Sequence, residues 1–262
     1  RLRGAGVNNL VLSVFPGVGM LDMAFEEEGF CVVRGPDLLW GGDIQKFHPP
    51  AGVFEGVIGG PPCQAFSRLR HLVEHNGYAV AENLIPEFER VIAEARPSWF
   101  IMENVPAAPT PAVAPYIIIR HDIVDAHVGG ETARRRAFHW GRWAHGEGRD
   151  LDIEWAALHT TQPEPTVCAS GGAAPIPVKI GGSGKVKRTF SERHMATRKG
   201  ASAMGYKTQA YFVDACRNQG LPATFLDDAP FTVAGKIKCV GNGVPLAMGR
   251  AIAKAVRKAV AP

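Results

Sequence analysis

One cysteine of this chain has the surroundings of a nucleophile. Cys63 lies in the segment Gly59-Gly60-Pro61-Pro62-Cys63-Gln64-Ala65-Phe66-Ser67, directly after the apolar residues Val53 to Ile58. Two glycines permit a sharp turn and two prolines fix φ, so the pattern predicts a stiff loop at the carboxyl end of a buried strand. Open α/β sheets bind their ligands at that edge. The alternative is a strand-ending loop with an incidental, half-buried cysteine.

A second group, nearer the N-terminus, has residue types that bind a nucleoside. In Phe15-Pro16-Gly17-Val18-Gly19 a Gly-x-Gly turn brings bare backbone close to a ligand at a helix N-terminus. The third glycine of G-x-G-x-x-G is missing, which disfavours a dinucleotide. Asp37 could accept both ribose hydroxyls, and Asp43-Ile44 could bind an adenine amino group and cover its ring. Each aspartate alone could be a solvated turn residue, but in this order they favour an adenosine-containing cofactor.

The elements that must position these residues alternate between strands and helices. This alternation predicts an α/β fold with a mostly parallel sheet and helices on both faces. A late pair of strands is expected at the sheet edge. The expected strands are Leu10–Phe15, Phe30–Arg34, Gly52–Ile58, Ser98–Met102, Tyr116–Ile119 and Ala137–Trp140, and the expected helices Leu21–Glu28, Ala81–Ala95 and Gly243–Val260.

The composition changes after Gly141, where glycine, proline and threonine become frequent. We therefore expect a main domain of residues 1–141 and 243–262, and a small second lobe with its connections over residues 142–242. Hydrophobic residues make up 46% of the 262 residues and charged ones 21%, as in globular proteins. No apolar run approaches the roughly 20 residues that span a bilayer, so we expect no membrane segment.

The cysteines and the charge narrow the class further. The five cysteines are widely spaced and form no C-x-x-C pair, which argues against a zinc site or a disulfide framework and for a reducing, cytoplasmic setting. We expect no metal. The net charge of +4 permits a polyanionic partner without requiring one.

In order along the chain, the motifs resemble those of the cytosine-5 DNA methyltransferase family. The resemblance spans nearly the whole chain, and the Pro-Pro-Cys-Gln and Glu-Asn-Val motifs are its most specific parts. The matching segments are Phe15-x-Gly17-x-Gly19, Gly60 to Ser67, Glu103-Asn104-Val105, Arg134-Arg135-Arg136, a fainter one over Arg193 to Tyr206, and Gly241-Asn242-Gly243-Val244-Pro245.

The resemblance implies the Rossmann-like fold of S-adenosylmethionine-dependent methyltransferases, with a small target-recognition domain over residues 142–242. It implies S-adenosyl-L-methionine as cofactor and a restriction–modification role of bacterial or phage type. The protein would act as a monomer and lie on the nucleoid when bound to DNA. By position in the motifs, the cofactor would contact Phe15, Gly17, Val18, Gly19, Asp37, Asp43, Ile44, Pro61, Leu84, Asn242 and Val244.

The resemblance also implies a covalent mechanism on a cytosine flipped out of double-stranded DNA. The thiolate of Cys63 would add to C6 and so push electrons toward C5, which is a poor nucleophile on its own. Glu103 would share a proton with N3, which calls for a protonated or proton-sharing carboxyl, and Arg136 would hold O2. Arg134 would hold a backbone phosphate or the cysteine loop.

DNA contact is expected mainly from charge. Lys185, Lys187 and Arg188 belong to a basic, glycine-rich stretch that suits a loop laid on phosphates, although a solvated surface strip has the same composition. A second set of residues, after the cysteine, would also contact DNA, namely Gln64, Ser67, Arg68 and Arg70.

The sequence departs from the family pattern at three positions, which leaves cofactor affinity and the support of Arg134 open. Ser13 stands where an acidic residue is usual, Met20 replaces a glycine and Thr132 a glutamine. Three other functions remain open. They are cytosine-5 methylation of tRNA by the same chemistry, a catalytically weak DNA-binding relative, and a nucleotide-dependent oxidoreductase, which the missing glycine disfavours.

Overall fold

The structure, a computed structural model, describes residues 9–62, 66, 82–144, 149–157, 164 and 209–261. Two compact units divide the chain: residues 1–123, 135–154 and 250–262 form the first, and residues 124–134 and 155–249 the second. These limits differ from the expected boundaries at residues 141 and 243. Among the described residues no helix is long and apolar enough to cross a membrane.

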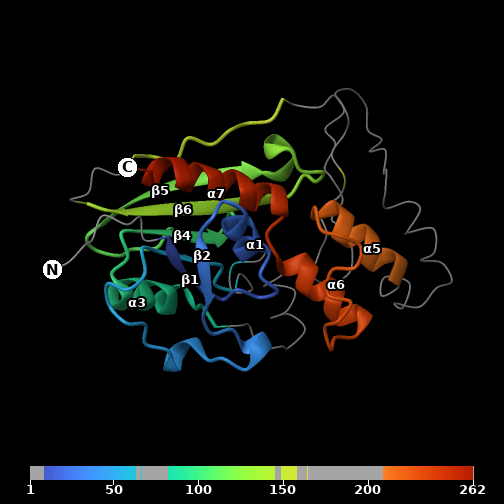
Figure 1. Cartoon of the computed structure of the whole chain (residues 1–262), viewed down its shortest axis with the longest axis horizontal. Helices are drawn as coiled ribbons and strands as arrows, with labels where there is room; N and C mark the ends of the chain where they lie inside the picture. The colour runs from blue at the N-terminus through green and yellow to red at the C-terminus, as the bar shows by residue number, and fades with distance from the viewer. Residues whose placement is uncertain are drawn as a thin grey trace. The chain divides into compact units, whose positions relative to one another are not determined.

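A six-stranded sheet in the order β2-β1-β3-β4-β6-β5 forms the centre of the first unit (Figure 1). β1 pairs with β2 and β3 in parallel, β3 pairs with β4 in parallel, and β4 pairs with β6 antiparallel. The strands are β1 (Leu10–Val14), β2 (Cys31–Arg34), β3 (Gly56–Gly59), β4 (Trp99–Asn104), β5 (Tyr116–Val124) and β6 (Arg135–Trp143). The expected α/β fold is confirmed, with the last two strands at one edge.

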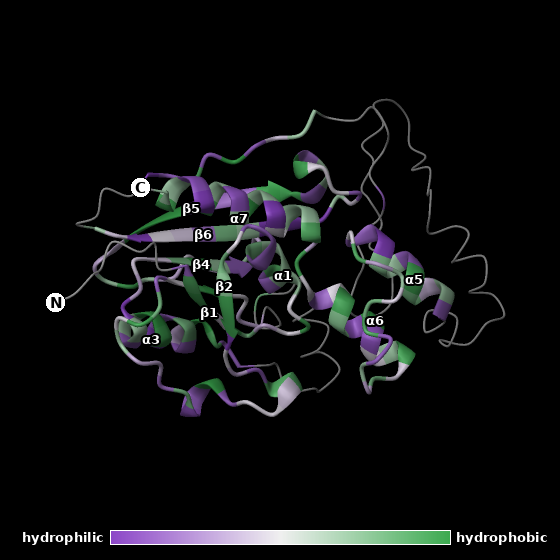
Figure 2. Ribbon diagram, viewed as in Figure 1, coloured by the Kyte–Doolittle hydropathy of each residue, from purple (hydrophilic) through white to green (hydrophobic). Residues whose placement is uncertain are grey.

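Neighbouring aromatic residues of β4 point to opposite faces of the sheet, as successive residues of a strand must. Phe100 packs against Phe88 of helix α3 (Ile85–Ala95), with ring centroids 5.8 Å apart. Trp99 stacks on Phe25 of helix α1 (Met20–Glu27), with centroids 6.1 Å apart. Helices therefore cover both faces. Figure 2 shows the pattern behind this arrangement, because β1 is mainly hydrophobic whereas α3 alternates between hydrophobic and hydrophilic residues.

Several predicted boundaries were too wide, each for a local reason. β3 begins at Gly56 instead of Gly52, because Gly52 adopts φ +71° in a turn. α3 begins at Ile85, after Leu84 and with Pro86 in its first turn, a position that suits proline. The last helix, α7 (Leu246–Val260), begins after Pro245 and not at Gly243.

The second unit contains two helices that the sequence patterns did not predict, α5 (Gln209–Asn218) and α6 (Val233–Asn242). Thr232 caps α6 by accepting a hydrogen bond from the Gly235 amide at 3.2 Å. Gln219 follows α5 and donates to the Val240 carbonyl of α6 at 3.0 Å. Both helices also bury apolar side chains, among them Phe212 of α5 and Ile237 of α6.

Candidate active and cofactor-binding sites

Glu103 lies at the carboxyl end of the central strand β4, beside the turn that leads into the cysteine loop. Its carboxylate forms an ion pair with Arg136 of the adjacent strand β6, with Nε and Oε1 2.7 Å apart. A Cβ on Gly60 would stand 3.0 Å from the second carboxylate oxygen of Glu103. Glu103 is 8% exposed. The strand register thus brings two of the predicted catalytic residues into contact, next to Gly60.

Asn104 is a supporting residue that the motif comparison quoted without giving it a role. Its side chain is buried, donates to the Pro61 carbonyl at 3.1 Å, and accepts from the Val105 amide at 2.8 Å. It therefore ties the end of β4 to the start of the proline segment. A buried amide that bonds two backbone groups holds both in one geometry. The sequence signal for this role was the position of Asn104, directly after Glu103 at the end of a strand.

Part of the predicted site lies outside the described residues. Cys63 and Gln64 belong there, as do Ser67, Arg68, Arg70 and the basic residues Lys185, Lys187 and Arg188. The structure therefore gives no geometry for the nucleophile or for the expected DNA contacts. It describes the frame on which the cysteine loop begins, at Gly60 and Pro61.

The glycine turn between β1 and α1 is fastened to the segment after β2. Asp37 accepts the Gly17 amide at 2.8 Å with one carboxylate oxygen and the Leu39 amide at 2.7 Å with the other. The Trp40 indole donates to the Gly17 carbonyl at 2.7 Å while the side chain stays 54% exposed. Trp40 is thus a further residue of this site. The sequence analysis missed it, although a tryptophan three residues after Asp37 was a signal.

An ion pair between a buried carboxylate and a half-exposed arginine supports the same turn. Asp22 of α1 accepts from the Ser13 hydroxyl at 2.5 Å and pairs with Arg34 of β2 at 3.0 Å. Burial raises the pKa of Asp22, against the lowering effects of Ser13 and Arg34. A Cβ on Gly19 would collide with the Arg34 guanidinium at 2.5 Å. Ser13, unusual for the family, therefore donates from β1 to a carboxylate of α1 that lies nine residues further along the chain.

The second aspartate and its neighbours join the same side of the first unit. Asp43 caps the short 3₁₀ helix η2 (Ile44–Lys46) by accepting the Gln45 amide at 3.0 Å. Ile44 is buried in the core cluster beneath α3, and both Phe15 and Leu84 pack against that cluster. The structure thereby gathers residues that the sequence assigned to cofactor binding from three separate segments. Pro61 is buried, whereas Val18 is partly exposed.

The remaining predicted site residues lie in the second unit. Arg134 is buried and donates to the carbonyls of Gly241 at 2.9 Å and Gly243 at 3.1 Å. It thus holds the segment that carries Asn242, which is exposed, and Val244, which is buried. These contacts give Arg134 backbone partners that were not expected.

Thr132, where the family usually has a glutamine, lies just before β6 and contacts a buried aspartate. Its hydroxyl donates to the buried carboxylate of Asp125 at 2.7 Å, and its amide donates to the same oxygen at 2.9 Å. Burial raises the pKa of Asp125. Sequence reasoning did not single out Asp125, because it stands outside every recognised motif.

The first-unit residues fit an adenosine-containing cofactor. A Cβ on Gly17 would meet no atom within 4 Å, so there is open space beside the turn. Each carboxylate oxygen of Asp37 accepts a hydrogen bond from one backbone amide, and such an oxygen can accept a second hydrogen bond from a ribose hydroxyl. The exposed Trp40 ring offers an aromatic surface nearby. Among the described residues no cluster of His, Cys, Asp and Glu could hold a metal ion.

Comparison with solved structures supports the fold. The chain superposes on a Spodoptera frugiperda DNMT2 mutant with a TM-score of 0.57, over 94% of this chain and 99% of that one. Their sequence identity is 13%. At that level the likeness concerns the fold alone.

Comparison with protein sequences identifies the family. The sequence model of the C-5 cytosine-specific DNA methylase family matches residues 41–112. The chain is 30% identical over 117 residues to the Type II methyltransferase M.NgoPII of Neisseria gonorrhoeae, which covers 36% of this chain and 33% of that protein. It therefore spans about a third of the first curated relatives. It is 32% identical over 118 residues to the Type II methyltransferase M.HgiGI of Herpetosiphon aurantiacus, which covers 37% of this chain and 90% of that protein. The chain belongs to the C-5 cytosine-specific DNA methylase family.

Proposed function

We propose that this protein transfers a methyl group from S-adenosyl-L-methionine to C5 of cytosine in double-stranded DNA. One observation carries the proposal. Glu103 is held by Arg136 at the end of β4 and faces the Gly60 turn, two residues before the proline that precedes Cys63. A carboxylate and a guanidinium at that place are the groups that an attacked cytosine ring requires. Membership of the family supports the same chemistry.

The reaction begins with Cys63, whose thiolate adds to C6 of a flipped-out cytosine. Addition moves electron density toward C5 and toward N3 and O2 of the ring. Glu103 shares a proton with N3, and Arg136 both orients Glu103 and balances the charge at O2. When bound, S-adenosylmethionine supplies an electrophilic methyl group on a sulfonium. Loss of the C5 proton and of the Cys63–C6 bond then restores the aromatic ring.

The cofactor side of the proposal uses the residues gathered on the first unit. Asp37 binds the ribose hydroxyls beside the glycine turn, and Asp43 with Ile44 binds the adenine. Trp40 offers its ring face to the adenine. Asn242 and Val244, in the segment that Arg134 holds, are the further residues that the family motif assigns to the cofactor, and target recognition is assigned to the second unit.

A tritium transfer assay tests the proposal. Purified protein with tritiated S-adenosylmethionine is incubated with duplex DNA of mixed sequence or with tRNA. We expect label in DNA, none in tRNA, and none with Cys63→Ser. Label in tRNA alone would overturn DNA as the substrate, and undiminished transfer by Cys63→Ser would overturn the covalent mechanism. Bisulfite sequencing of DNA from expressing cells then reads the target sequence.

A further inference from the structure

The segment between β2 and β3 has little regular structure of its own. Its only regular structure there after Trp40 is η2, a single 3₁₀ turn of three residues in the described chain. Such turns are marginal by themselves, because their hydrogen bonds are few and poorly aligned. Yet this segment presents Asp43 and Ile44, which the proposed function assigns to the cofactor. Contacts from outside the segment therefore help to fix its backbone.

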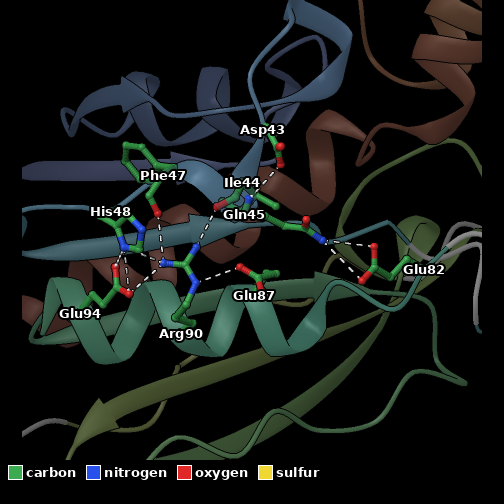
Figure 3. A network of polar contacts seen from close by, with 9 residues as sticks. All are labelled: Asp43, Ile44, Gln45, Phe47, His48, Glu82, Glu87, Arg90 and Glu94. Atoms are coloured by element: carbon green, nitrogen blue, oxygen red, sulfur yellow. Dashed lines mark hydrogen bonds and ion pairs between the residues drawn. The ribbon is translucent and has the colours of Figure 1, made fainter.

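Arg90 of α3 supplies that fixture (Figure 3). Its Nη2 donates to the Ile44 carbonyl at 2.7 Å, and its Nη1 donates to the Phe47 carbonyl at 3.0 Å. These carbonyls belong to the first residue of η2 and to the residue that caps its end. One side chain thus grips both ends of the turn, 43 and 46 residues away in the sequence.

Two carboxylates on the same helix hold the guanidinium in place. Glu87 accepts from Nε of Arg90 at 2.8 Å, and Glu94 accepts from Nη1 at 2.9 Å. The Arg90 side chain is 25% exposed, so water screens these pairs only in part. The carboxylates stand three and four residues from Arg90 along α3, which places all of them on one face.

The geometry requires arginine and not merely a positive charge. A guanidinium carries five N–H groups in a rigid plane, so it can reach two carbonyls and two carboxylates at once. A lysine ammonium has its donors on one nitrogen and cannot span both ends of η2. An ion pair on the helix surface alone would not include the two hydrogen bonds to the carbonyls of Ile44 and Phe47.

We infer that Arg90 is a positioning residue for the cofactor: it fixes the backbone of η2 so that Asp43 and Ile44 stand ready to bind the adenine. The inference rests on the proposed function. It assigns Arg90 to cofactor affinity and not to the chemical step, since no side-chain hydrogen bond of Arg90 within the described part of the chain reaches Glu103 or Arg136. Loss of Arg90 should therefore raise the KM for S-adenosylmethionine and leave kcat at saturating cofactor unchanged.

The test compares Arg90→Met, Arg90→Lys and the matched control Arg250→Met. Arg250 also pairs with a carboxylate, Glu27, through two hydrogen bonds, but within the described part of the chain its side chain donates to no backbone carbonyl. Calorimetric titration with S-adenosylhomocysteine gives Kd, steady-state kinetics on DNA gives KM and kcat, and urea unfolding reports stability. Hydrogen exchange reports the amides of Lys46 and Phe47, which bond Asp43 and Ile44 carbonyls within the turn.

We expect Arg90→Met to weaken S-adenosylhomocysteine binding at least about tenfold, Arg90→Lys to recover part of the affinity, and Arg250→Met to bind as the parent does. Exchange at Lys46 and Phe47 should accelerate only in the Arg90 variants. A folded Arg90→Met with parental Kd would overturn the inference. If Arg90→Met does not fold, Arg90→Lys decides: parental Kd overturns the inference, and weakened binding at an unchanged unfolding midpoint supports it.

Failure of the proposed function is distinguishable from failure of this inference. A parent protein that binds no S-adenosylhomocysteine would overturn the proposed cofactor, and with it the role of Arg90 in binding that cofactor. A parent that binds it, with Arg90→Met binding equally well, would overturn the inference alone.

Discussion

Two carboxylate–arginine pairs stand on different strands near the carboxyl edge of the same sheet and differ in what surrounds them. Asp22 pairs with Arg34 beneath the glycine turn, has no exposed surface and also receives the Ser13 hydroxyl. Glu103 pairs with Arg136 at the end of β4, keeps 8% of its surface exposed and faces the turn toward Cys63.

The difference teaches how similar chemistry serves two purposes. The Asp22 pair joins β1, α1 and β2 through a buried carboxylate, so we expect its effect to be on the shape of the Gly17–Gly19 turn. The Glu103 pair joins β4 and β6 and faces the turn toward Cys63, so we expect its effect to be on the reaction. Substitutions in the two regions should therefore separate stability from turnover.

The largest effect should come from Glu103→Gln. The amide keeps the size of the side chain but cannot share a proton with N3 in the same way, so we expect the single-turnover rate of methyl transfer to fall on the order of 100-fold to 10,000-fold. Binding of S-adenosylhomocysteine, measured by calorimetry, should stay close to the parent value. A rate within about tenfold of the parent would place Glu103 outside the chemistry.

Acid should weaken the fold through His139, on β6 opposite Met102 of β4. Burial lowers the pKa of His139 to about 4, whereas an unfolded histidine titrates near 6.5. The unfolded chain therefore takes up the proton first, and stability is lost as pH falls from about 6.5 toward 4. The loss from this residue should be about 3 kcal/mol.

Urea unfolding of the parent and of His139→Phe at neutral pH and near pH 4 measures this loss as a difference between the two proteins. Equal pH dependence in both would show that His139 titrates normally. Asp22 acts with the opposite sign: its pKa is raised, so the stability it contributes is present at low pH and is lost as pH rises through the folded pKa.

Asp22→Ala should lower the free energy of unfolding by about 1–3 kcal/mol, because it leaves the Ser13 hydroxyl and the Arg34 guanidinium without their shared acceptor. Asp22→Asn retains an oxygen that can accept from Ser13 and should cost less. At a temperature where the protein stays folded, kcat at saturating cofactor should be unchanged. A large fall in kcat would mean that the Asp22 region also takes part in the chemistry.

The smallest effect should come from a third pair, which is exposed. Arg250 and Glu27 are 51% and 42% exposed, and water screens their interaction even though they lie 2.6 Å apart. We expect Arg250→Ala to change the free energy of unfolding by less than about 1 kcal/mol, measured in urea. A loss as large as that of Asp22→Ala would show that burial does not explain the ranking of the pairs.

Much of the fold followed from local patterns. The apolar runs at Leu10, Phe30 and Ser98 became strands, because each is short and bounded by turn residues. The glycine turn and Asp37 could be placed together because a parallel β1–β2 pair brings their ends to the same edge. Glu103 and Arg136 could be paired only through the family resemblance, since no local pattern gives the register of β4 with β6.

The rest depended on contacts between distant residues. In the sequence Arg90 is one charge on an amphipathic helix. Its hydrogen bonds to the Ile44 and Phe47 carbonyls form only when α3 and η2 pack against each other. Arg134 was expected to meet phosphate or the cysteine loop, and its bonds to Gly241 and Gly243 span more than a hundred residues. Hydrogen bonds of this kind leave no periodicity in the sequence.

The most direct measurement of the central claim is covalent capture on DNA that contains 5-fluorocytosine. Fluorine at C5 cannot leave as a proton does, so an enzyme that attacks C6 through Cys63 stays attached after methyl transfer. With S-adenosylmethionine present, the parent should form an adduct that survives denaturing electrophoresis, and Cys63→Ala should form none. An adduct with Cys63→Ala, or none with a parent that methylates ordinary DNA, would contradict the account.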